Sequence, residues 1–494
     1  MLAALCRIPL ALAYGHQRDV HRPPELLFAY HWLRPSEVPT PADESRAVAQ
    51  LRAAVDPAGG SRWLDPALPL VRAAPTGRNR FRDESVPAVR PDILLFAVES
   101  LRAAELGYVP GNAAGAESAT PRLDRLAREG VVFSRYIANG NPSPRGFFAI
   151  NAGVWDHRES FIVSGSTGSE FDALPERLRR IGYFTLGLWG ANPSFDNQLF
   201  WATQWYDRIR YAGPAGPLGI ARSIPDDLLI DQLLAEIAAH DRAHAAQPLF
   251  AYVATAGTHE PYTIEGDTRA ADATVRAIAA EKDPRRRYRR VLAHLDAQIG
   301  RVLDALDARP SGRPRLVIVV GDHSDAAGDP IRPEMRDLPN NAVEWTAALI
   351  AGPSEWIGPV PRVETFASSH VDLTPTLLDL VGDRGPTVAM GTNLFADVPP
   401  ELRTALSVSG QGYRLDRGGW SLFVRRDHPE TIYTRPAFAP LDSLRTGVEG
   451  SPFTPEDARR LWENMNTWSY LIENDRGWRA ALLGGGRASR ASTP

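Results

Sequence analysis

From residue 91 onward, short hydrophobic runs alternate with stretches in which hydrophobic positions recur every three or four residues. Four of the runs are too continuous for half-exposed strands and therefore predict buried parallel strands. They cover residues 92–98, 184–189, 249–255 and 315–320. Helical periodicity is found at 120–130, 174–182, 226–243 and 288–308. This alternation predicts an α/β fold, a doubly wound, mostly parallel sheet with helices on both faces.

The pattern differs on both sides of this region. Residues 15–88 are rich in Pro, Arg and Ala, which predicts an extended arm with a helix at about 44–55. After about residue 386 the pattern breaks into shorter pieces, WSLFVRR at 420–426 and a helical stretch at 454–474. We therefore expect an arm or linker at 1–88, a main domain at 89–385 and a small C-terminal subdomain at 386–494.

The first residues are apolar but match neither a membrane helix nor a signal peptide. Residues 1–14 are shorter than the roughly 20 apolar residues that span a bilayer. They also lack the basic start and the small-residue cleavage site of a secretory signal. A remnant of a membrane segment is one interpretation of this stretch.

Composition narrows the classes of protein only slightly. The chain has 494 residues and a formal net charge of -4, which gives no support for nucleic-acid binding. Cys6 is the only cysteine, so there is neither a disulfide framework nor a thiolate metal site.

Polar side chains follow three of the predicted strands. Glu99 comes directly after 92–98, Asp322 and His323 come just after 315–320, and His259 follows 249–255. Each alone is most simply a turn or capping residue, because strand ends are normally polar. Together they are ligands suited to Zn²⁺ or Mn²⁺, and in such a sheet ligands bind beyond the carboxyl ends of the strands.

Ser143 allows two interpretations. In the sequence NPSPRGFFAI it is a favoured N-cap residue, with Pro144 at the first helical position. A bound divalent cation would instead make its hydroxyl a nucleophile, and the helix N-terminus would bind the anionic group under attack. His259 could donate a proton to that group or to the leaving group. The deciding question is whether these loops meet at one point.

The motifs VES, NPSPRGFFAINAG, GANPSFDN, THEPY, VVGDHSD and SHVDLTPTLLDLVG occur in this order between about residues 90 and 385. In this order they resemble the alkaline-phosphatase superfamily, and within it sulfatase-like proteins of the lipoteichoic acid synthase type. The resemblance implies a catalytic domain at 89–385 and one divalent metal ion, Mn²⁺ in most relatives, with Zn²⁺ or Mg²⁺ as alternatives. It implies a hydroxyl nucleophile that forms a covalent intermediate with phosphorus.

The resemblance also assigns roles to individual residues. The implied metal ligands are Glu99, Ser143, Asp322 and His323. His259 would lie at the substrate phosphate, and Asp196 and Asn197 would contact the donor headgroup. His370, in SHVDLTPTLLDL, is interpreted as structural.

Three features depart from the family pattern. The nucleophile is Ser where lipoteichoic acid synthases have Thr, which preserves a hydroxyl. In the sulfatase motif C/S-x-P-x-R, whose first residue becomes formylglycine, a frame starting at Ser143 has Arg145 in place of Pro and Phe147 in place of Arg. Sulfate-ester hydrolysis is therefore disfavoured. The N-terminal membrane helices usual in the family are not found in these 494 residues, which leaves open whether the chain is a soluble relative, an ectodomain or a sequence that begins too late.

These points predict a metal-dependent phosphotransferase that moves a phosphoglycerol- or phosphoethanolamine-like group from a lipid headgroup donor to a glycan or lipid acceptor. A hydrolase of phosphate or sulfate esters on the same fold is one alternative, and an inactive binding module is another. The resemblance implies a location at the membrane surface, on the outer face of the cytoplasmic membrane, in the periplasm or outside the cell. The oligomeric state stays open.

Overall fold

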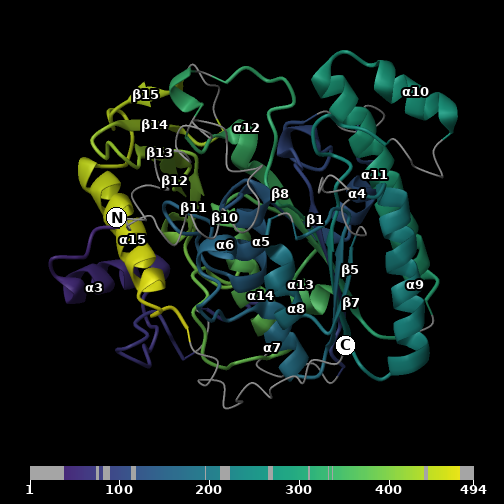
Figure 1. Cartoon of the computed structure of the whole chain (residues 1–494), viewed down its shortest axis with the longest axis horizontal. Coiled ribbons are helices and arrows are strands. Elements are labelled where there is room, and N and C mark those ends of the chain that lie inside the picture. The colour runs from purple at the N-terminus through teal and green to yellow at the C-terminus, as the bar shows by residue number, and fades with distance from the viewer. Residues whose placement is uncertain are drawn as a thin grey trace, which may run out of the picture.

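The computed structural model describes residues 38–478, apart from stretches at 74–76, 82–88, 113–117, 195, 212–222, 265–270, 310–311, 332, 337 and 439–442. Figure 1 shows the chain. The apolar segment at 1–14 lies outside the described residues, so its interpretation stays open. Among the residues that are described, no helix is both long and apolar enough to cross a bilayer.

The main sheet has nine strands within the described residues, in the order β10-β2-β8-β7-β1-β6-β4-β5, with β9 paired to β2. Their bounds are β1 Asp92–Val98, β2 Gly130–Ile137, β4 Phe184–Trp189, β5 Arg208–Tyr211, β6 Leu249–Ala254, β7 Arg315–Gly321, β8 Trp345–Ala351, β9 Arg362–Glu364 and β10 Ser368–Ser369. The four predicted strands are confirmed as β1, β4, β6 and β7, which lie side by side and run parallel. Strand β8, which the sequence patterns did not single out, pairs antiparallel with β2 and β7.

Helices cover both faces of this sheet, as predicted (Figure 1). On one face Ile93, Leu95 and Ala97 of β1 join a core with residues of α5, α7, α8 and α14. The alternate residues Leu94 and Phe96 join a second core with residues of α4, α9 and α11. Successive strand residues point to opposite faces, so a strand covered on both faces has a continuous hydrophobic run.

The helical periods correspond to helices of the structure, with shifts of a few residues at their ends. The helices of the main region are α4 Pro121–Ala127, α5 Ser143–Ala152, α6 Ile162–Gly165, α7 Leu174–Arg180, α8 Gln198–Trp205, α9 Asp226–His244, α10 Asp272–Ala280, α11 Pro284–Asp307, α12 Asn341–Glu344, α13 Ser354–Ile357 and α14 Leu373–Val381. Short 3-10 helices are η2 Ala103–Glu105, η4 Pro333–Met335, η5 His370–Asp372 and η6 Pro400–Leu402. The largest shift is at α11, which begins four residues before the predicted start because Asp283 caps it and Pro284 opens it.

A second sheet lies in the C-terminal region, where it has the order β15-β14-β13-β12-β11-β3. Its strands are β3 Gly140–Asn141, β11 Thr404–Ser409, β12 Gly412–Arg417, β13 Trp420–Arg425, β14 Ile432–Pro436 and β15 Arg445–Thr446. Strands β11 to β15 pair antiparallel, whereas β3 pairs parallel with β11. Because β3 comes just before α5 in the chain, the second sheet supports the start of that helix.

The remaining helices are α3 Glu44–Val55 and α15 Pro455–Glu473, which lie side by side (Figure 1). Both were predicted from sequence, and the short piece of pattern at 420–426 corresponds to β13. The Gln50 side chain donates to Glu463 Oε2 at 3.0 Å, and the Tyr470 hydroxyl donates to Glu44. The N-terminal arm is thereby joined to the C-terminal helix.

Candidate active site

The candidate site lies at the carboxyl ends of two neighbouring central strands. Glu99 follows β1, and Asp322 and His323 follow β7, whose Gly321 is paired with Val98. Ligand atoms of these three side chains all lie within 4.8 Å of one another. Parallel strands bring their carboxyl ends to one edge, which is why residues far apart in sequence meet here.

Ser143 lies at the first position of α5 and faces this group. Its Oγ is 3.2 Å from Glu99 Oε2 and 3.2 Å from His323 Nε2. The interpretation of Ser143 as the N-cap residue is wrong, because Pro142 is the N-cap residue and no side-chain capping hydrogen bond is formed. The hydroxyl does not accept from the N–H groups of the helix because it is directed toward Glu99 and His323.

Hydrogen bonds to the backbone orient the ring of His323 and the carboxylate of Asp322. His323 Nδ1 lies 2.7 Å from the carbonyl oxygen of Ser324, so Nδ1–H donates there and Nε2 faces the site. Asp322 Oδ1 accepts from the N–H groups of Ser100 and His323, at 2.9 and 2.7 Å. Its other oxygen, Oδ2, lies 3.7 Å from His323 Nε2.

The buried carboxylates of the site favour a cation beside them. Burial raises the pKa of Glu99 to about 7, and the charge of Asp322 acts in the same direction. Burial alone lowers the pKa of His323, but the carboxylates of Asp322 and Glu99 outweigh it, and the resulting pKa is about 9. The two buried carboxylates therefore favour a positive charge on the His323 ring at neutral pH.

Three neighbouring hydroxyl groups that sequence reasoning missed hold Glu99 in place. Thr255 Oγ1 accepts from the Glu99 N–H at 3.1 Å, and Thr258 Oγ1 donates to the Glu99 carbonyl. The Ser100 hydroxyl donates to Glu99 Oε1 at 2.8 Å, and Ser100 has a left-handed φ of 53°. Strained backbone of this kind persists only where its surroundings hold it. The signal available in the sequence was the position of Thr255 and Thr258 just before His259.

Gly146 is a second feature that sequence reasoning missed. A Cβ atom at this position would lie 2.3 Å from the carbonyl oxygen of Asp322, so only glycine lets α5 approach the chain after β7 this closely. The close approach brings Ser143 to His323. A glycine in the first turn of a predicted helix was the available signal, because glycine there is otherwise unfavourable.

His259 lies in the loop after β6 and is exposed. Its Nδ1 is 2.6 Å from the carbonyl oxygen of Glu260, so Nδ1–H donates there. Nε2 is the ring nitrogen that this hydrogen bond does not use. The loop is joined to the chain after β7 through the Tyr262 hydroxyl, which donates to Asp325. His259 is near enough to lower the pKa values of Glu99 and Asp196 by its charge.

Asp196 and Asn197 lie in the loop between β4 and α8. Burial raises the pKa of Asp196 to about 6, and among its neighbours His259 lowers this pKa while Asp322 raises it. Asn197 has a left-handed φ of 57°, and its side-chain amide donates to the carbonyl of Val163 at 2.6 Å. The Asn197 side chain therefore stabilises the loop in which it lies. Substrate contact by Asp196 and Asn197 stays a prediction.

The residues that replace the formylglycine motif are buried in packing contacts. Arg145 forms an ion pair with Asp156 at 3.0 Å, and its guanidinium lies over the ring of Phe161. Phe147 stacks on Trp205 with ring centroids 5.8 Å apart. His370 is fully buried, and its Nε2 lies 2.7 Å from the Gly321 carbonyl, in agreement with its structural interpretation.

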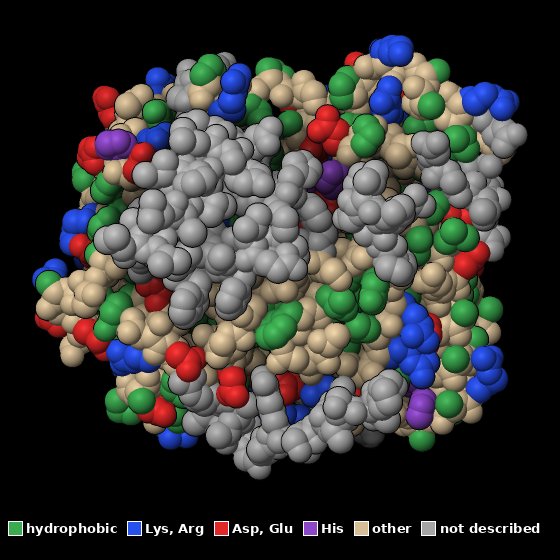
Figure 2. Space-filling model, viewed as in Figure 1, with side chains coloured by type: hydrophobic (Ala, Val, Ile, Leu, Met, Phe, Trp, Pro, Cys, Tyr) green, Lys and Arg blue, Asp and Glu red, His purple; other side chains and the backbone are tan. Residues whose placement is uncertain are grey.

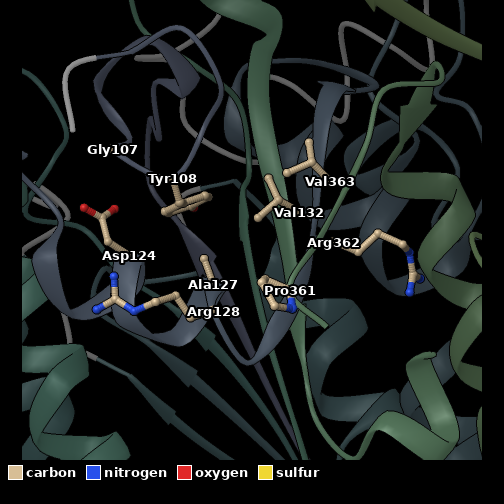
Figure 3. A pocket seen from close by; sticks show the side chains of 9 residues that line it. All are labelled: Gly107, Tyr108, Asp124, Ala127, Arg128, Val132, Pro361, Arg362 and Val363. Atoms are coloured by element: carbon tan, nitrogen blue, oxygen red, sulfur yellow. The ribbon is translucent and has the colours of Figure 1, made fainter. Parts of the chain in front are cut away.

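A cavity of about 380 Å³ lies elsewhere in the main domain (Figure 3). It is lined by residues of α4, β2, β9 and the chain between η2 and α4, among them Tyr108, Val132 and Val363. None of the candidate site residues lines it, so it plays no part in the site.

The four side chains fit a divalent metal ion. They present two carboxylates, one imidazole nitrogen and one hydroxyl, a donor set that suits Zn²⁺ or Mn²⁺. His323 and Asp322 are already oriented through the atoms that would not bind the ion. Such outer hydrogen bonds are the usual support of metal ligands.

Comparison with known proteins places this arrangement in a family. The family model described as "Sulfatase" matches residues 91–383, well over half of the chain. The chain belongs to the sulfatase family. This range contains every candidate site residue, and it agrees with the predicted relationship to the alkaline-phosphatase superfamily.

Solved structures show the same fold at low sequence identity. A protein of the alkaline phosphatase superfamily from Vibrio parahaemolyticus is 20% identical, with a TM-score of 0.67 over 88% of this chain and 97% of that one. The lipoteichoic acid synthase LtaP from Listeria monocytogenes is 15% identical, with a TM-score of 0.60 over 81% and 94%. The phosphonate monoester hydrolase of Agrobacterium radiobacter is 18% identical, with a TM-score of 0.51 over 80% and 95%.

Proposed function

We propose that this member of the sulfatase family is a metal-dependent phosphotransferase. It moves a phosphoglycerol- or phosphoethanolamine-like group from a lipid to a glycan or lipid acceptor, through a covalent intermediate on Ser143. The observation that carries the proposal is the position of Ser143 Oγ, 3.2 Å from both Glu99 Oε2 and His323 Nε2, at the N-terminus of α5.

The reaction has two displacements at phosphorus. In the first, Ser143 Oγ forms a bond to phosphorus while the bond from phosphorus to the lipid oxygen breaks; Glu99 Oε2 already accepts the hydroxyl hydrogen. His259 donates a proton to the departing oxygen. In the second, an acceptor hydroxyl attacks phosphorus and gives its proton to His259, the Ser143–phosphorus bond breaks, and Oγ regains its proton from Glu99. The N–H groups of the first turn of α5 bind the anionic group throughout.

Glu99, Ser143, Asp322 and His323 would hold one divalent metal ion, with Mn²⁺ as the first candidate. When bound, the ion would lower the pKa of the Ser143 hydroxyl and offset the charge on the phosphoryl oxygens.

Phosphorus is favoured over sulfur by the surroundings of Ser143. Sulfatases of the formylglycine type need Pro and Arg at the positions of Arg145 and Phe147. Here both side chains are buried: Arg145 forms an ion pair with Asp156, and Phe147 stacks on Trp205. Ser143 therefore acts as an unmodified hydroxyl, which is chemistry suited to phosphoryl transfer.

Substitution of Ser143 tests the proposal directly. Ser143→Ala should lower turnover of a phospholipid donor by several orders of magnitude, because the attacking atom is lost. The free energy of unfolding should change by less than the roughly 1 kcal/mol of a lost cap, since the hydroxyl caps nothing. Ser143→Thr keeps a hydroxyl and should retain substantial activity. Intact-mass measurement during turnover should detect the Ser143 adduct.

Ser354 offers a matched control. It is also the first residue of a helix that follows a proline, and it also makes no capping hydrogen bond. Ser354→Ala should leave turnover unchanged. Wild-type turnover by Ser143→Ala would refute the nucleophile. Release of the headgroup phosphate without any acceptor adduct would instead identify a hydrolase, in which water takes the place of the acceptor.

Metal content tests the ligand set independently of turnover. Elemental analysis of the purified wild type should find one divalent ion per chain, and chelation should remove it. His323→Gln should lose this ion because an amide replaces the imidazole Nε2. His428→Gln, at an exposed histidine of the C-terminal region, should keep it. Full metal content in His323→Gln would contradict the assigned ligands.

We also propose that the reaction takes place on the outer side of the cytoplasmic membrane, where a lipid donor would be met. The support is the likeness in fold to the lipoteichoic acid synthase LtaP. Fractionation of cells that produce the native protein should find it with the envelope. Recovery of the active protein in the cytosol would overturn this part of the proposal.

A further inference from the structure

Basic residues are concentrated at one end of the molecule. Between residues 276 and 290, in the end of α10 and the start of α11, the sequence has seven Lys and Arg but only two acidic residues. The whole chain, in contrast, has a net charge of -4. Figure 1 shows this segment as a projecting end at the upper right, and Figure 2 shows Lys and Arg side chains there. We call residues 276–290 the basic tip.

Some of these side chains form ion pairs or hydrogen bonds within the protein. Arg285 and Arg289 both pair with the buried carboxylate of Glu105. Arg287 donates to the carbonyl of Glu281. The two ion pairs with Glu105 fix the position of the basic tip on the main domain.

Of the four others, Arg290 pairs with Glu281 at 3.6 Å and the remaining three are directed to solvent. Arg276, Lys282 and Arg286 are exposed, and none of them forms an ion pair with any residue that the structure describes. The exposed residues around Arg276 are small: Ala273, Thr274, Ala277, Ala279 and Ala280. The surface is therefore cationic, without large apolar side chains that would insert into a partner.

The basic tip lies beside the candidate active site. The hydroxyl of Tyr288, in the first turns of α11, donates to the carbonyl of Ser100 at 2.9 Å. Arg287 Nη1 reaches the carbonyl of Pro261, two residues after His259, at 3.5 Å. A surface that bound the basic tip would thus lie at the rim of the site.

We infer that the basic tip docks the protein on an anionic phospholipid bilayer. Lys282, Arg286 and Arg276 present an exposed charged surface, and a sheet of lipid phosphates is complementary to it. Each basic residue near an anionic leaflet contributes attraction that adds to that of its neighbours and weakens with salt. This inference goes beyond the transfer reaction, because docking needs no turnover.

Sedimentation with vesicles tests the inference. The 494-residue chain should bind vesicles of phosphatidylcholine and phosphatidylserine in equal parts, and should bind vesicles of phosphatidylcholine alone far more weakly. Phosphatidylserine is chosen because its headgroup is not a proposed donor group. The double variant Lys282→Glu/Arg286→Glu should bind the anionic vesicles at least about tenfold more weakly. Its turnover of a water-soluble phosphodiester should match the wild type, which shows that the variant is folded.

A matched control makes the same change of charge elsewhere. Arg46→Glu/Arg62→Glu, at two exposed arginines near the N-terminal arm, should bind the anionic vesicles like the wild type. Equal loss of binding in both double variants would overturn the inference, as would equal binding of the wild type to neutral vesicles. Displacement from the vesicles by soluble glycerol phosphate or by a polyphosphate at the same phosphate concentration would also overturn it. The Ser143→Ala variant should bind vesicles normally, so failure of docking and failure of the proposed reaction are distinguishable.

Discussion

At Gly146 one hydrogen atom in place of a side chain decides how close a helix comes to a strand end. The carbonyl oxygen of Asp322 occupies the space that a Cβ atom would need. Ser143, three residues earlier in the same helix, is held near His323 by this approach. The position of the proposed nucleophile therefore depends on a residue without a side chain.

Gly146→Ala should therefore impair the site without removing any group from it. The added methyl overlaps backbone, which cannot rotate away, so α5 must shift; overpacking of this kind costs roughly 1–3 kcal/mol of stability. Turnover should fall at least about tenfold, because small misplacements of reacting groups are costly. Gly168→Ala is the matched control, since nothing lies within 4 Å of the new Cβ. Wild-type turnover in Gly146→Ala would contradict this account.

At the scale of elements, one carboxylate of α11 serves the start of another helix. Asp296 is buried, and its two oxygens accept from the N–H groups of Arg122 and Leu123, in the first turn of α4. A helix start needs such acceptors, and Thr120, the N-cap residue, makes no side-chain cap hydrogen bond. Burial raises the pKa of Asp296 to about 6.

Stability should consequently depend on pH through Asp296. Its folded pKa lies above the ordinary value of 3.8, so the folded state binds the proton more tightly. This contribution is fully present below the unfolded pKa and is lost as pH rises through about 6. Between about pH 4.5 and 7.5 the free energy of unfolding should fall less in Asp296→Asn, which stays neutral, than in the wild type. The difference between the two proteins should be up to about 2 kcal/mol. Urea unfolding at both pH values measures this, and parallel pH dependence in both proteins would contradict it.

At the scale of the molecule, the C-terminal helix supports the segment that follows α5. The Trp468 indole N–H donates to the carbonyl of Trp155 at 2.7 Å, and the Ser469 hydroxyl accepts from the N–H of Arg158. The second sheet supports the other end of α5, through the pairing of β3 with β11. Both ends of the helix that carries Ser143 thus depend on residues after 400.

We therefore expect loss of packing at α15 to destabilise the whole structure. Trp468 is fully buried, and Trp468→Ala should lower the free energy of unfolding by about 3–5 kcal/mol. Trp468→Phe keeps most of the ring volume but loses the hydrogen bond to Trp155, so its loss should be smaller. Urea unfolding followed by circular dichroism and by tryptophan fluorescence should give one coincident transition. A separate early transition for the C-terminal region would contradict this coupling.

The sequence by itself determined the central strands, the helices around them and the edge at which polar residues gather. Continuous hydrophobic runs are found in strands that are covered on both faces, and parallel strands end at a common edge. For this reason Glu99, Asp322 and His323 could be predicted as neighbours, and their ligand atoms do lie within 4.8 Å of one another. These inferences needed only the period of the pattern and the direction of the strands.

Only the tertiary structure decided where the Ser143 hydroxyl points, why Gly146 is needed and which groups hold Glu99. Local sequence favoured Ser143 as a cap, because a helix start always needs acceptors; the competing partners, Glu99 and His323, are 44 and 180 residues away. The pairing of β3 with β11 joins segments more than 260 residues apart and has no local signal. Periodicity records which face of an element is buried, whereas contacts between distant residues depend on how the faces pack.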